Sequence, residues 1–409
     1  MNKNTSQSIY AKSWTKLKKD KAAMLGLFVI SCAVIISILG GNIRPDSSPF
    51  ANDGISSIGK LSTYSTIKTL KVKRNKKIIT ENFFGKLFFG GQEPIYNLIP
   101  ISSYRFEEDK IKVALYSSFK SSKYSESEYQ EFNLADVCYS IDKYDGNKPI
   151  FEASNIRFKT LNQLEKEISI QELQKEIESN NIKDKTFWLG TDVQGRDLLS
   201  RTMAGTVVSL SVGLIAVLIS LIIGVTLGAV AGYYRGWIDD AIMWFINVVW
   251  SIPTLLLIIA VTLFLGKGFY TVFLAVGLTM WVELARVVRG QILSIREKEY
   301  IEAGRALGFS NYRIITKHVF PNIIGSIIVI CASNFAAAIL IEAGLSFLGI
   351  GSQIPMVSWG TMIEQHRSFI THTDKAFLAL IPGLSIIFLV FAFMLFGNGL
   401  RDSFDVHEE

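Results

Sequence analysis

Six apolar runs, each about the length needed to cross a lipid bilayer, constrain the fold of this 409-residue chain. A helix needs roughly 20 predominantly apolar residues to cross about 30 Å of hydrocarbon. Of all residues 49% are hydrophobic and only 19% are charged, whereas soluble domains carry roughly 25% charged residues. These values point away from a soluble cytosolic enzyme and exclude a disordered chain and a collagen. The runs are Ala22–Gly40, Thr206–Gly232, Ile242–Leu265, Tyr270–Val288, Ile323–Leu348 and Ala376–Gly397.

Small residues recur inside these runs and predict a packed bundle of helices rather than six separate anchors. Gly224, Gly228 and Gly232 follow one another at intervals of four within the second run. Glycine at this spacing lets two helices approach closely in lipid. We therefore predict an all-α polytopic membrane protein with six transmembrane helices.

Basic residues predict the orientation of the bundle. Six lysines precede the first run, and six lysines and arginines lie in the loop 289–321 between the fourth and fifth runs. Basic segments next to membrane spans remain in the cytoplasm. With six spans, residues 1–21, the loop 289–321 and the tail 406–409 fall on this one side, so we expect a multi-pass protein with both termini cytoplasmic. The run 22–40 is expected to be an uncleaved helix, because no small-residue cleavage site follows it.

Residues 41–190 form a long charged connection between the first two runs, on the side away from the cytoplasm, and precede the remaining core, 191–405. Residues 111–116 alternate in polarity and predict a strand. Thr160 and Gln163 match a capping box, so we expect a helix to begin there and continue through the apolar residues up to Ile177. An α+β extracytoplasmic insert is the expected fold.

Within this insert, the basic stretch Lys68–Lys77 is expected to be a solvated surface. Cys138 is the only cysteine of the insert and allows no internal disulfide. We find neither the spacing of a metal site nor a catalytic constellation there. The sequence does not reveal what the insert does.

The segment from Glu299 to Pro321 carries the most informative pattern in the chain. It predicts a short helix, a break at Gly308, a second helix capped by Ser310 and a stop at Pro321. Two short helices across the membrane surface could be gripped by a soluble partner and pass its movement to the neighbouring spans. An ordinary basic loop accounts for the spacing alone equally well.

Specific residues of this segment resemble the EAA signature of ATP-binding cassette (ABC) importer permeases. Glu302, Ala303 and Gly304 are followed by Gly308 and, nine residues later, by a stretch that ends at Pro321. In that family the loop is the coupling helix, which docks into a cleft of the ATPase subunit. The resemblance implies that these residues couple the chain to an ATPase.

Three further segments resemble oligopeptide and dipeptide importer permeases of the C-subunit type, and this family also includes nickel importers. They are Leu189–Arg201, Ala285–Leu293 and Ile341–Gly351. The resemblance covers roughly residues 10–45 and 186–405 and implies the fold of a binding-protein-dependent permease in a bacterial inner membrane. Residues 41–190 depart from the family, whose loop at this place is much shorter.

The resemblance also implies the partners of this chain. A second permease subunit would complete the pore, two cytosolic ATPase subunits would use ATP and magnesium, and an extracytoplasmic solute-binding protein would deliver the cargo. The chain itself would need no cofactor, bind no metal or nucleic acid and catalyse no reaction, with the lipid bilayer as its surroundings.

Three charged residues within the apolar runs are candidates for the translocation path or a gate. Glu342 lies inside the fifth run, where a carboxylate is costly unless it faces protein or water. It is either a path residue or a hydrogen-bonding residue between helices. Glu283 and Arg286 are one helical turn apart and are expected to form a local ion pair, with a gate contact as the alternative. The four histidines are scattered and form no ligand set.

We therefore predict the permease subunit of an ABC importer, with peptides as cargo. A permease for nickel or another small solute is an alternative within the same class. A membrane-anchored sensor or scaffold, with 41–190 as its working domain, is an alternative from a different class. A secondary transporter would require broken helices and inverted halves, neither of which the sequence clearly shows.

Overall fold

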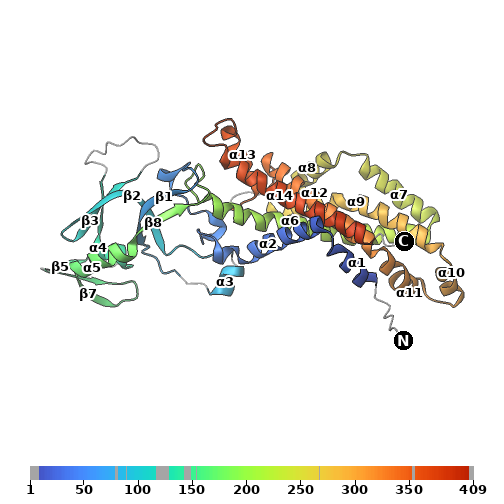
Figure 1. Ribbon diagram of the computed structural model, residues 1–409, viewed down its shortest axis with the longest axis horizontal. Coiled ribbons are helices and arrows are strands. Elements are labelled where there is room, and N and C mark those ends of the chain that lie inside the picture. The colour runs from blue at the N-terminus through green and yellow to red at the C-terminus, as the bar shows by residue number, and fades with distance from the viewer. Residues whose placement is uncertain are drawn as a thin grey trace. The chain divides into compact units, whose positions relative to one another are not determined.

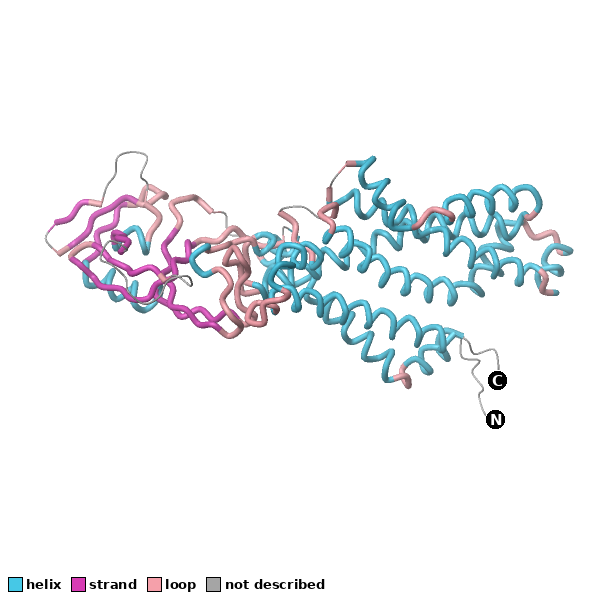
Figure 2. Tube along the Cα trace, turned by 90° about the horizontal axis from the view of Figure 1, so that it is seen from above, coloured by secondary structure: helices cyan, strands magenta, loops and turns pink. Residues whose placement is uncertain are grey.

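The computed structural model describes residues 9–78, 82–88, 90–116, 129–141, 149–152, 154–266, 268–351 and 355–404. The chain divides into two compact units. Unit 1 comprises Met1–Ser37, Gly205–Ser368 and Ala379–Glu409, and unit 2 comprises Ile38–Ala204 and Phe369–Leu378. Figure 2 distinguishes the helices, in cyan, from the strands, in magenta, and all the described strands belong to unit 2.

Five helices among the described residues are long and apolar enough to cross a membrane. They contain three of the six predicted runs completely and two others except for one terminal residue, Leu348 of the fifth run and Ala376 of the sixth. These helices are α2 (Lys21–Ile43), α6 (Leu198–Tyr234), α9 (Phe269–Arg296), α12 (Phe320–Phe347) and α14 (Phe377–Phe404). The shorter helices of unit 1 are α1 (Ile9–Leu17), α7 (Gly236–Trp250), α8 (Thr254–Leu265), α10 (Glu299–Ala306), α11 (Asn311–Ile314) and α13 (Trp359–His366).

The run Ile242–Leu265, expected to be one helix, is broken. Helices α7 and α8 meet there at 89°, and only the two together are long and apolar enough to span a membrane. The break falls at Pro253, which has no N–H to donate and disfavours helical backbone in the residue before it. The run is therefore divided between two helices rather than forming one, and six spans result only if this bent pair counts as a single span.

Helices α6 and α9 pack in parallel along the glycines of α6. A Cβ at Gly228 would lie 2.4 Å from the carbonyl oxygen of Ala285, and one at Gly232 would lie 2.8 Å from that of Arg289. Contacts this short leave no room for a side chain, which confirms the predicted close approach. Because the two helices run in the same direction, the chain returns between them through α7 and α8.

One end of unit 1 gathers segments that are far apart in the sequence. A Cβ at Gly399 in α14 would lie 2.3 Å from the Cβ of Ala23 in α2. A Cβ at Gly325 in α12 would lie 2.9 Å from the ring of Phe404 at the end of α14. The starts of α2 and α12 and the end of α14 therefore share this end, where Figure 1 also shows α1, α10 and α11.

Unit 2 is built on antiparallel strands. The larger sheet has the order β4-β3-β2-β1-β8 and the smaller one β5-β6-β7. The strands are β1 (Ser65–Lys73), β2 (Tyr96–Glu107), β3 (Lys110–Leu115), β4 (Tyr129–Asn133), β5 (Ile150–Glu152), β6 (Asn155–Lys159), β7 (Glu165–Ser169) and β8 (Ile182–Phe187). The short helices are α3 (Phe83–Phe88), α4 (Leu134–Cys138) and α5 (Ile170–Glu176), and α4 and α5 contribute Leu134 and Leu173 to the core with the sheets.

The structure confirms the predicted strand at 111–116 as β3, but it corrects two other expectations for this part of the chain. Residues Thr160 to Leu164 form a turn between β6 and β7, and the helix begins only after Ser169, whose side chain caps it. The stretch Lys68–Lys77 is not simply a solvated surface, because it contains most of β1 and the fully buried Leu70.

Candidate functional site

Helix α10 ends in a turn that only glycine adopts easily. Gly308 has φ +76°, its N–H donates to the carbonyl of Arg305 at 2.9 Å, and the N–H of Phe309 donates to that of Gly304 at 3.0 Å. These two bonds form a Schellman motif, in which a glycine in the left-handed conformation ends the helix. The predicted break at Gly308 is therefore confirmed.

The second helix starts as predicted but does not stop at Pro321. Ser310 accepts a hydrogen bond from the N–H of Arg313 at 3.4 Å and caps α11. A π-helical turn, Ile315–Val319, then joins α11 to α12, and Pro321 lies in the first turn of α12. Proline is tolerated in the first turn of a helix, where its missing N–H costs little, so Pro321 does not end the helix here.

An exposed surface containing apolar residues surrounds the glycine turn. Tyr300, Ala303 and Leu307 share one face of α10 because they are spaced three and four residues apart. Leu307 is 73% exposed and Tyr312, on α11, is 79% exposed. Such apolar side chains outside the apolar spans indicate a contact surface. We call these four residues, together with the exposed Glu302, the EAA surface.

Not all residues of the signature belong to this surface. Glu302, Ala303, Gly308 and Pro321 are exposed, whereas Gly304 is buried. A Cβ at Gly304 would lie 3.4 Å from the ring of Phe309. A small side chain such as alanine would therefore fit at Gly304 in ordinary contact with Phe309.

Tyr233, at the end of α6, connects the EAA loop to the bundle. Its hydroxyl donates to Oδ1 of Asn311 at 2.7 Å, and its carbonyl accepts a hydrogen bond from Arg296. The guanidinium of Arg305 lies 5.5 Å from the centre of its ring. Tyr233 also packs in one core cluster with Ile301 of α10 and with buried residues of α9 and α12. The EAA loop therefore contacts three long helices, α6, α9 and α12.

Glu283 and Arg286 do not form the expected ion pair. Glu283 is exposed, and no ion pair joins it to Arg286 in the described chain. Arg286 instead donates to Oδ1 of Asn247 at 3.0 Å and lies 3.7 Å from the centre of the Trp250 ring. Both of these partners belong to α7, so the arginine connects two helices.

An ion pair that the sequence did not predict lies farther along the same face of α9. Arg289 donates from Nε and Nη2 to the two carboxylate oxygens of Asp239 in α7, at 2.5 and 2.7 Å. A bidentate pair of this kind fixes orientation as well as distance. In the sequence, Arg289 was only one of the six basic residues that predict a cytoplasmic location for the loop 289–321.

Glu342 is fully buried within α12. Ser346, one turn later, donates to its Oε1 at 2.7 Å. A Cβ at Gly360 in α13 would lie 2.5 Å from the carbonyl oxygen of Ala343, so α13 packs directly beside this turn. The carboxylate thus faces protein rather than lipid, as the cost of burial requires.

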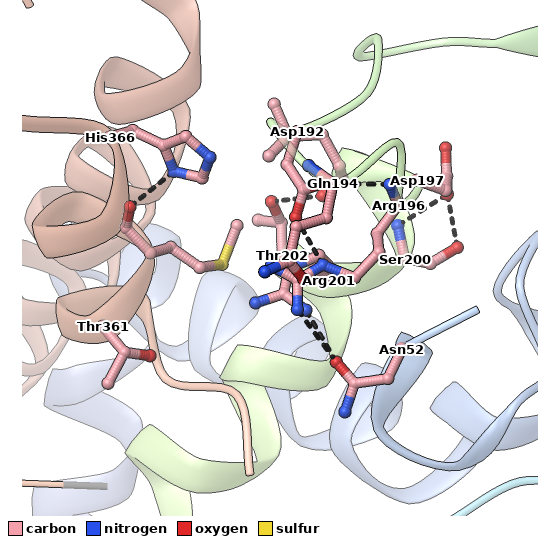
Figure 3. Close-up of polar contacts among 12 residues, drawn as sticks. Asn52, Asp192, Gln194, Arg196, Asp197, Ser200, Arg201, Thr202, Thr361 and His366 are labelled. Carbon is pink, nitrogen blue, oxygen red and sulfur yellow. Dashed lines mark hydrogen bonds and ion pairs between the residues drawn. The ribbon is translucent and has the colours of Figure 1, made fainter. Parts of the chain in front are cut away.

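The segment Leu189–Arg201 forms a buried polar cluster within unit 2 (Figure 3). Oδ2 of Asp192 lies 2.6 Å from Nε of Arg196 and 3.3 Å from Nε of Arg201. Asn52 accepts a hydrogen bond from each arginine, at 3.3 and 2.8 Å. One carboxylate and one amide therefore compensate two buried guanidinium groups.

Two neighbouring groups complete this cluster. Asp197 accepts hydrogen bonds from the N–H and hydroxyl of Ser200, and burial raises the pKa of the Asp197 carboxyl. Gly195 has φ +72°, and a Cβ there would lie 1.8 Å from the carbonyl oxygen of Ile55. The glycine of this motif is thus required for chain packing.

Comparison with known proteins identifies the family to which this chain belongs. Residues 224–405 match the model of the binding-protein-dependent transport system inner membrane component. The glutathione transport permease GsiD of Pectobacterium atrosepticum is 41% identical over 226 residues, which are 55% of this chain and 74% of that protein. The chain belongs to this family. It is a permease subunit of an ABC importer.

Two further relatives of this permease have similar coverage. The oligopeptide permease OppC of Bacillus subtilis is 37% identical over 54% of this chain and 72% of that protein. The dipeptide permease DppC of Alkalihalophilus pseudofirmus is 41% identical over 53% and 71%. An inward-facing structure of the MetNI methionine ABC transporter aligns with a TM-score of 0.41 at 18% identity, covering 49% of this chain and 94% of that chain.

The described part of the permease contains no group of three or more histidine, cysteine, aspartate or glutamate side chains that could hold a metal ion. Gly308 and Glu302 were recognisable from the sequence, whereas Tyr233 was not, because an aromatic residue at the end of an apolar run carries no distinguishing signal.

Proposed function

We propose that this permease forms half of a translocation pore for peptides and is driven by cytosolic ATPase subunits through the EAA surface. A related permease forms the other half, and an extracytoplasmic binding protein delivers the cargo. The observation that carries the proposal is the exposure of Tyr300, Leu307 and Tyr312 around the rigid turn at Gly308.

The contacts of the loop support its role in coupling. An ATPase that binds the EAA surface pushes on α10, and the hydrogen bond that the Tyr233 hydroxyl donates to Asn311 passes this movement to α6. The core shared by α9 and α12 moves with it. One position of α10 then corresponds to a pore open to the outside and another to a pore open to the cytoplasm. The ATPase shifts the populations of these two states when it binds and hydrolyses ATP with magnesium.

Packing supports the proposed orientation in the bacterial inner membrane. The starts of α2 and α12 share one end of unit 1 with the end of α14. The described lysines before α2 and the basic loop 289–321 lie at this end, which we place in the cytoplasm. The bent pair α7 and α8 then counts as one of six crossings.

The relatives guide the choice of cargo. Their names specify glutathione, oligopeptides and dipeptides, all of which contain amide-linked amino acids. A nickel chelate or another small solute is the second candidate. Glu342 and Arg286 are proposed to help shape the path or its gate, because both lie within the apolar helices and contact neighbouring polar groups. Glu283 is a weaker candidate for this role, since it is exposed.

A charge on the EAA surface tests the proposal. Leu307→Asp places a carboxylate on the exposed apolar face, and we expect uptake of radiolabelled dipeptides into cells to fall by about tenfold or more. The control is Ile150→Asp, which changes a 58% exposed aliphatic residue on β5. Membrane insertion should be the same in both variants. Unchanged uptake with Leu307→Asp would contradict the coupling role.

A further inference from the structure

A cavity of about 430 Å³ lies within unit 2. Its wall combines the end of β1, the residues after α4, the turn between β6 and β7, and the start of β7. This volume lies in the range of pockets that bind small molecules. The cavity belongs to the part of the chain outside the family match, which covers residues 224–405.

The wall carries positive charge and no carboxylate. Five of its side chains are cationic, and no acidic residue lines it among the described residues. Outside the wall, Glu93 pairs with one of these cations and Asp53 lies 3.5 Å from another. The five cations are Lys73, Arg74, Lys76, Lys77 and Lys166.

Most of this charge is not compensated within the described structure. No ion pair is present there for Lys73, Lys77 or Lys166. Nζ of Lys166 lies 4.5 Å from the centre of the Tyr139 ring. Nε of Arg74 is buried and has no hydrogen-bond partner among the described residues. A buried donor without a partner costs free energy and favours an incoming acceptor.

The remaining wall supplies shape and apolar surface. Leu161 donates from its N–H to the carbonyl of Ser140 at 3.0 Å, and Ser140 donates from Oγ to the carbonyl of Arg74 at 2.9 Å. These bonds hold three separate segments around the cavity. Ile78, Ile95 and the leucines of the turn contribute apolar surface.

We propose that this cavity binds a small anion that carries an apolar portion, with a carboxylate or phosphate held by the lysines and Arg74. A peptide with a free carboxylate and a lipid with an anionic headgroup both have this chemistry. The inference does not depend on transport or coupling, because binding to unit 2 requires neither the ATPase nor the second permease.

Binding to the full chain in nanodiscs of phosphatidylcholine tests this inference by calorimetry. One probe is N-acetyl-alanyl-phenylalanine, with its neutral C-terminal amide as control, and the other is dihexanoylphosphatidic acid, with dihexanoylphosphatidylcholine as control. We expect at least one anionic probe to bind, and its neutral or zwitterionic counterpart to bind more weakly. Binding of the peptide acid alone identifies a carboxylate ligand, and binding of the phosphatidic acid alone identifies a phosphate ligand.

Charge-matched variants show whether the cavity is the site. The triple variant Lys73→Gln, Lys77→Gln, Lys166→Gln should weaken binding by about tenfold, the combined effect of three modest charge contacts. The triple variant Lys68→Gln, Lys175→Gln, Lys183→Gln removes the same charge from exposed positions outside the cavity and should keep the affinity. The single variant Lys166→Gln gives a smaller loss with less risk to folding. Absence of binding, or equal weakening by both triple variants, would overturn the inference.

Discussion

Asp192 has no exposed surface and lies between two guanidinium groups that are themselves almost completely buried. Replacing it with alanine leaves Arg196 and Arg201 without their carboxylate. Breaking a buried pair in this way costs about 3–5 kcal/mol. We expect Asp192→Ala to lower the thermal unfolding temperature of the purified chain in detergent, whereas Asp184→Ala, at an exposed aspartate of β8, should change it little. Equal unfolding temperatures would show that the cluster does not stabilise the fold.

Two neighbouring groups in unit 2 predict a loss of stability at high pH. Burial raises the pKa of Cys138 to about 12, and burial together with Glu176 raises that of Tyr139 to about 12. The folded state therefore holds both protons more tightly than the unfolded state. Their contribution to stability is complete below the ordinary thiol pKa near 9 and is lost as the pH rises toward 12.

Urea unfolding of the full chain measures this loss, with limited proteolysis of unit 2 as the readout of unfolding. The urea midpoint should fall between pH 9 and pH 11, and Cys138→Ala combined with Tyr139→Phe should reduce the slope. A midpoint with the same pH dependence in this variant as in the unchanged chain would contradict the assignment.

Individual positions were predictable where a local rule governs them. The break at Gly308 and the cap at Ser310 both follow from backbone preferences of single residues. The partners of Arg286 were not predictable, because helical spacing identifies neighbours on one helix but not those on the next. Asn247 and Trp250 approach it only because α7 packs on α9.

At the scale of the helix, the glycines of α6 determine how closely α9 can approach. Gly228→Ala introduces a methyl group 2.4 Å from the carbonyl oxygen of Ala285. We expect a loss of about 1–3 kcal/mol from overpacking. Gly290→Ala in α9 meets nothing within 4 Å and should be neutral or slightly stabilising, because alanine favours a helix over glycine. Thermal unfolding of the two variants side by side measures the difference, and equal effects would exclude the tight packing.

At Gly308 the effect of backbone conformation can be tested separately from the effect of side-chain contacts. A Cβ at this position meets nothing within 4 Å, so a substitution acts mainly through the left-handed backbone conformation. Gly308→Val should cost about 1–2 kcal/mol locally and reduce coupled uptake. Gly308→Asn should retain most of the uptake, because asparagine tolerates this conformation. Equal uptake by both variants would argue against a required turn.

Most long helices were predictable, but the smaller elements were less so. The six runs follow from length and hydropathy, and only Pro253 breaks one of them. The helix expected after Thr160 failed because Gln163 adopts φ +62° in a turn between two strands. The cap lies at Ser169, where the spacing to Glu172 offered the same signal later in the chain.

At the scale of the whole molecule, the resemblance in residues 186–405 predicted the permease class, and the family match bears it out. The fold of unit 2 could be predicted only in class. Its sheet pairs β1 with β8, so that Ser65 lies opposite Phe187. Such distant pairing leaves no local pattern, and neither does the convergence of five cations on one cavity.

The central claim is that an ATPase binds the EAA surface, and crosslinking in native membranes tests it most directly. Leu307→Cys and Ile150→Cys, each in a background where the three native cysteines are serine, carry the same thiol-reactive crosslinker. We predict that position 307 forms a crosslink to a nucleotide-binding ATPase subunit and that added ATP changes its yield, while position 150 forms none. Absence of an ATPase from the adducts of position 307, or labelling of this position by an impermeant reagent from outside intact cells, would contradict the account.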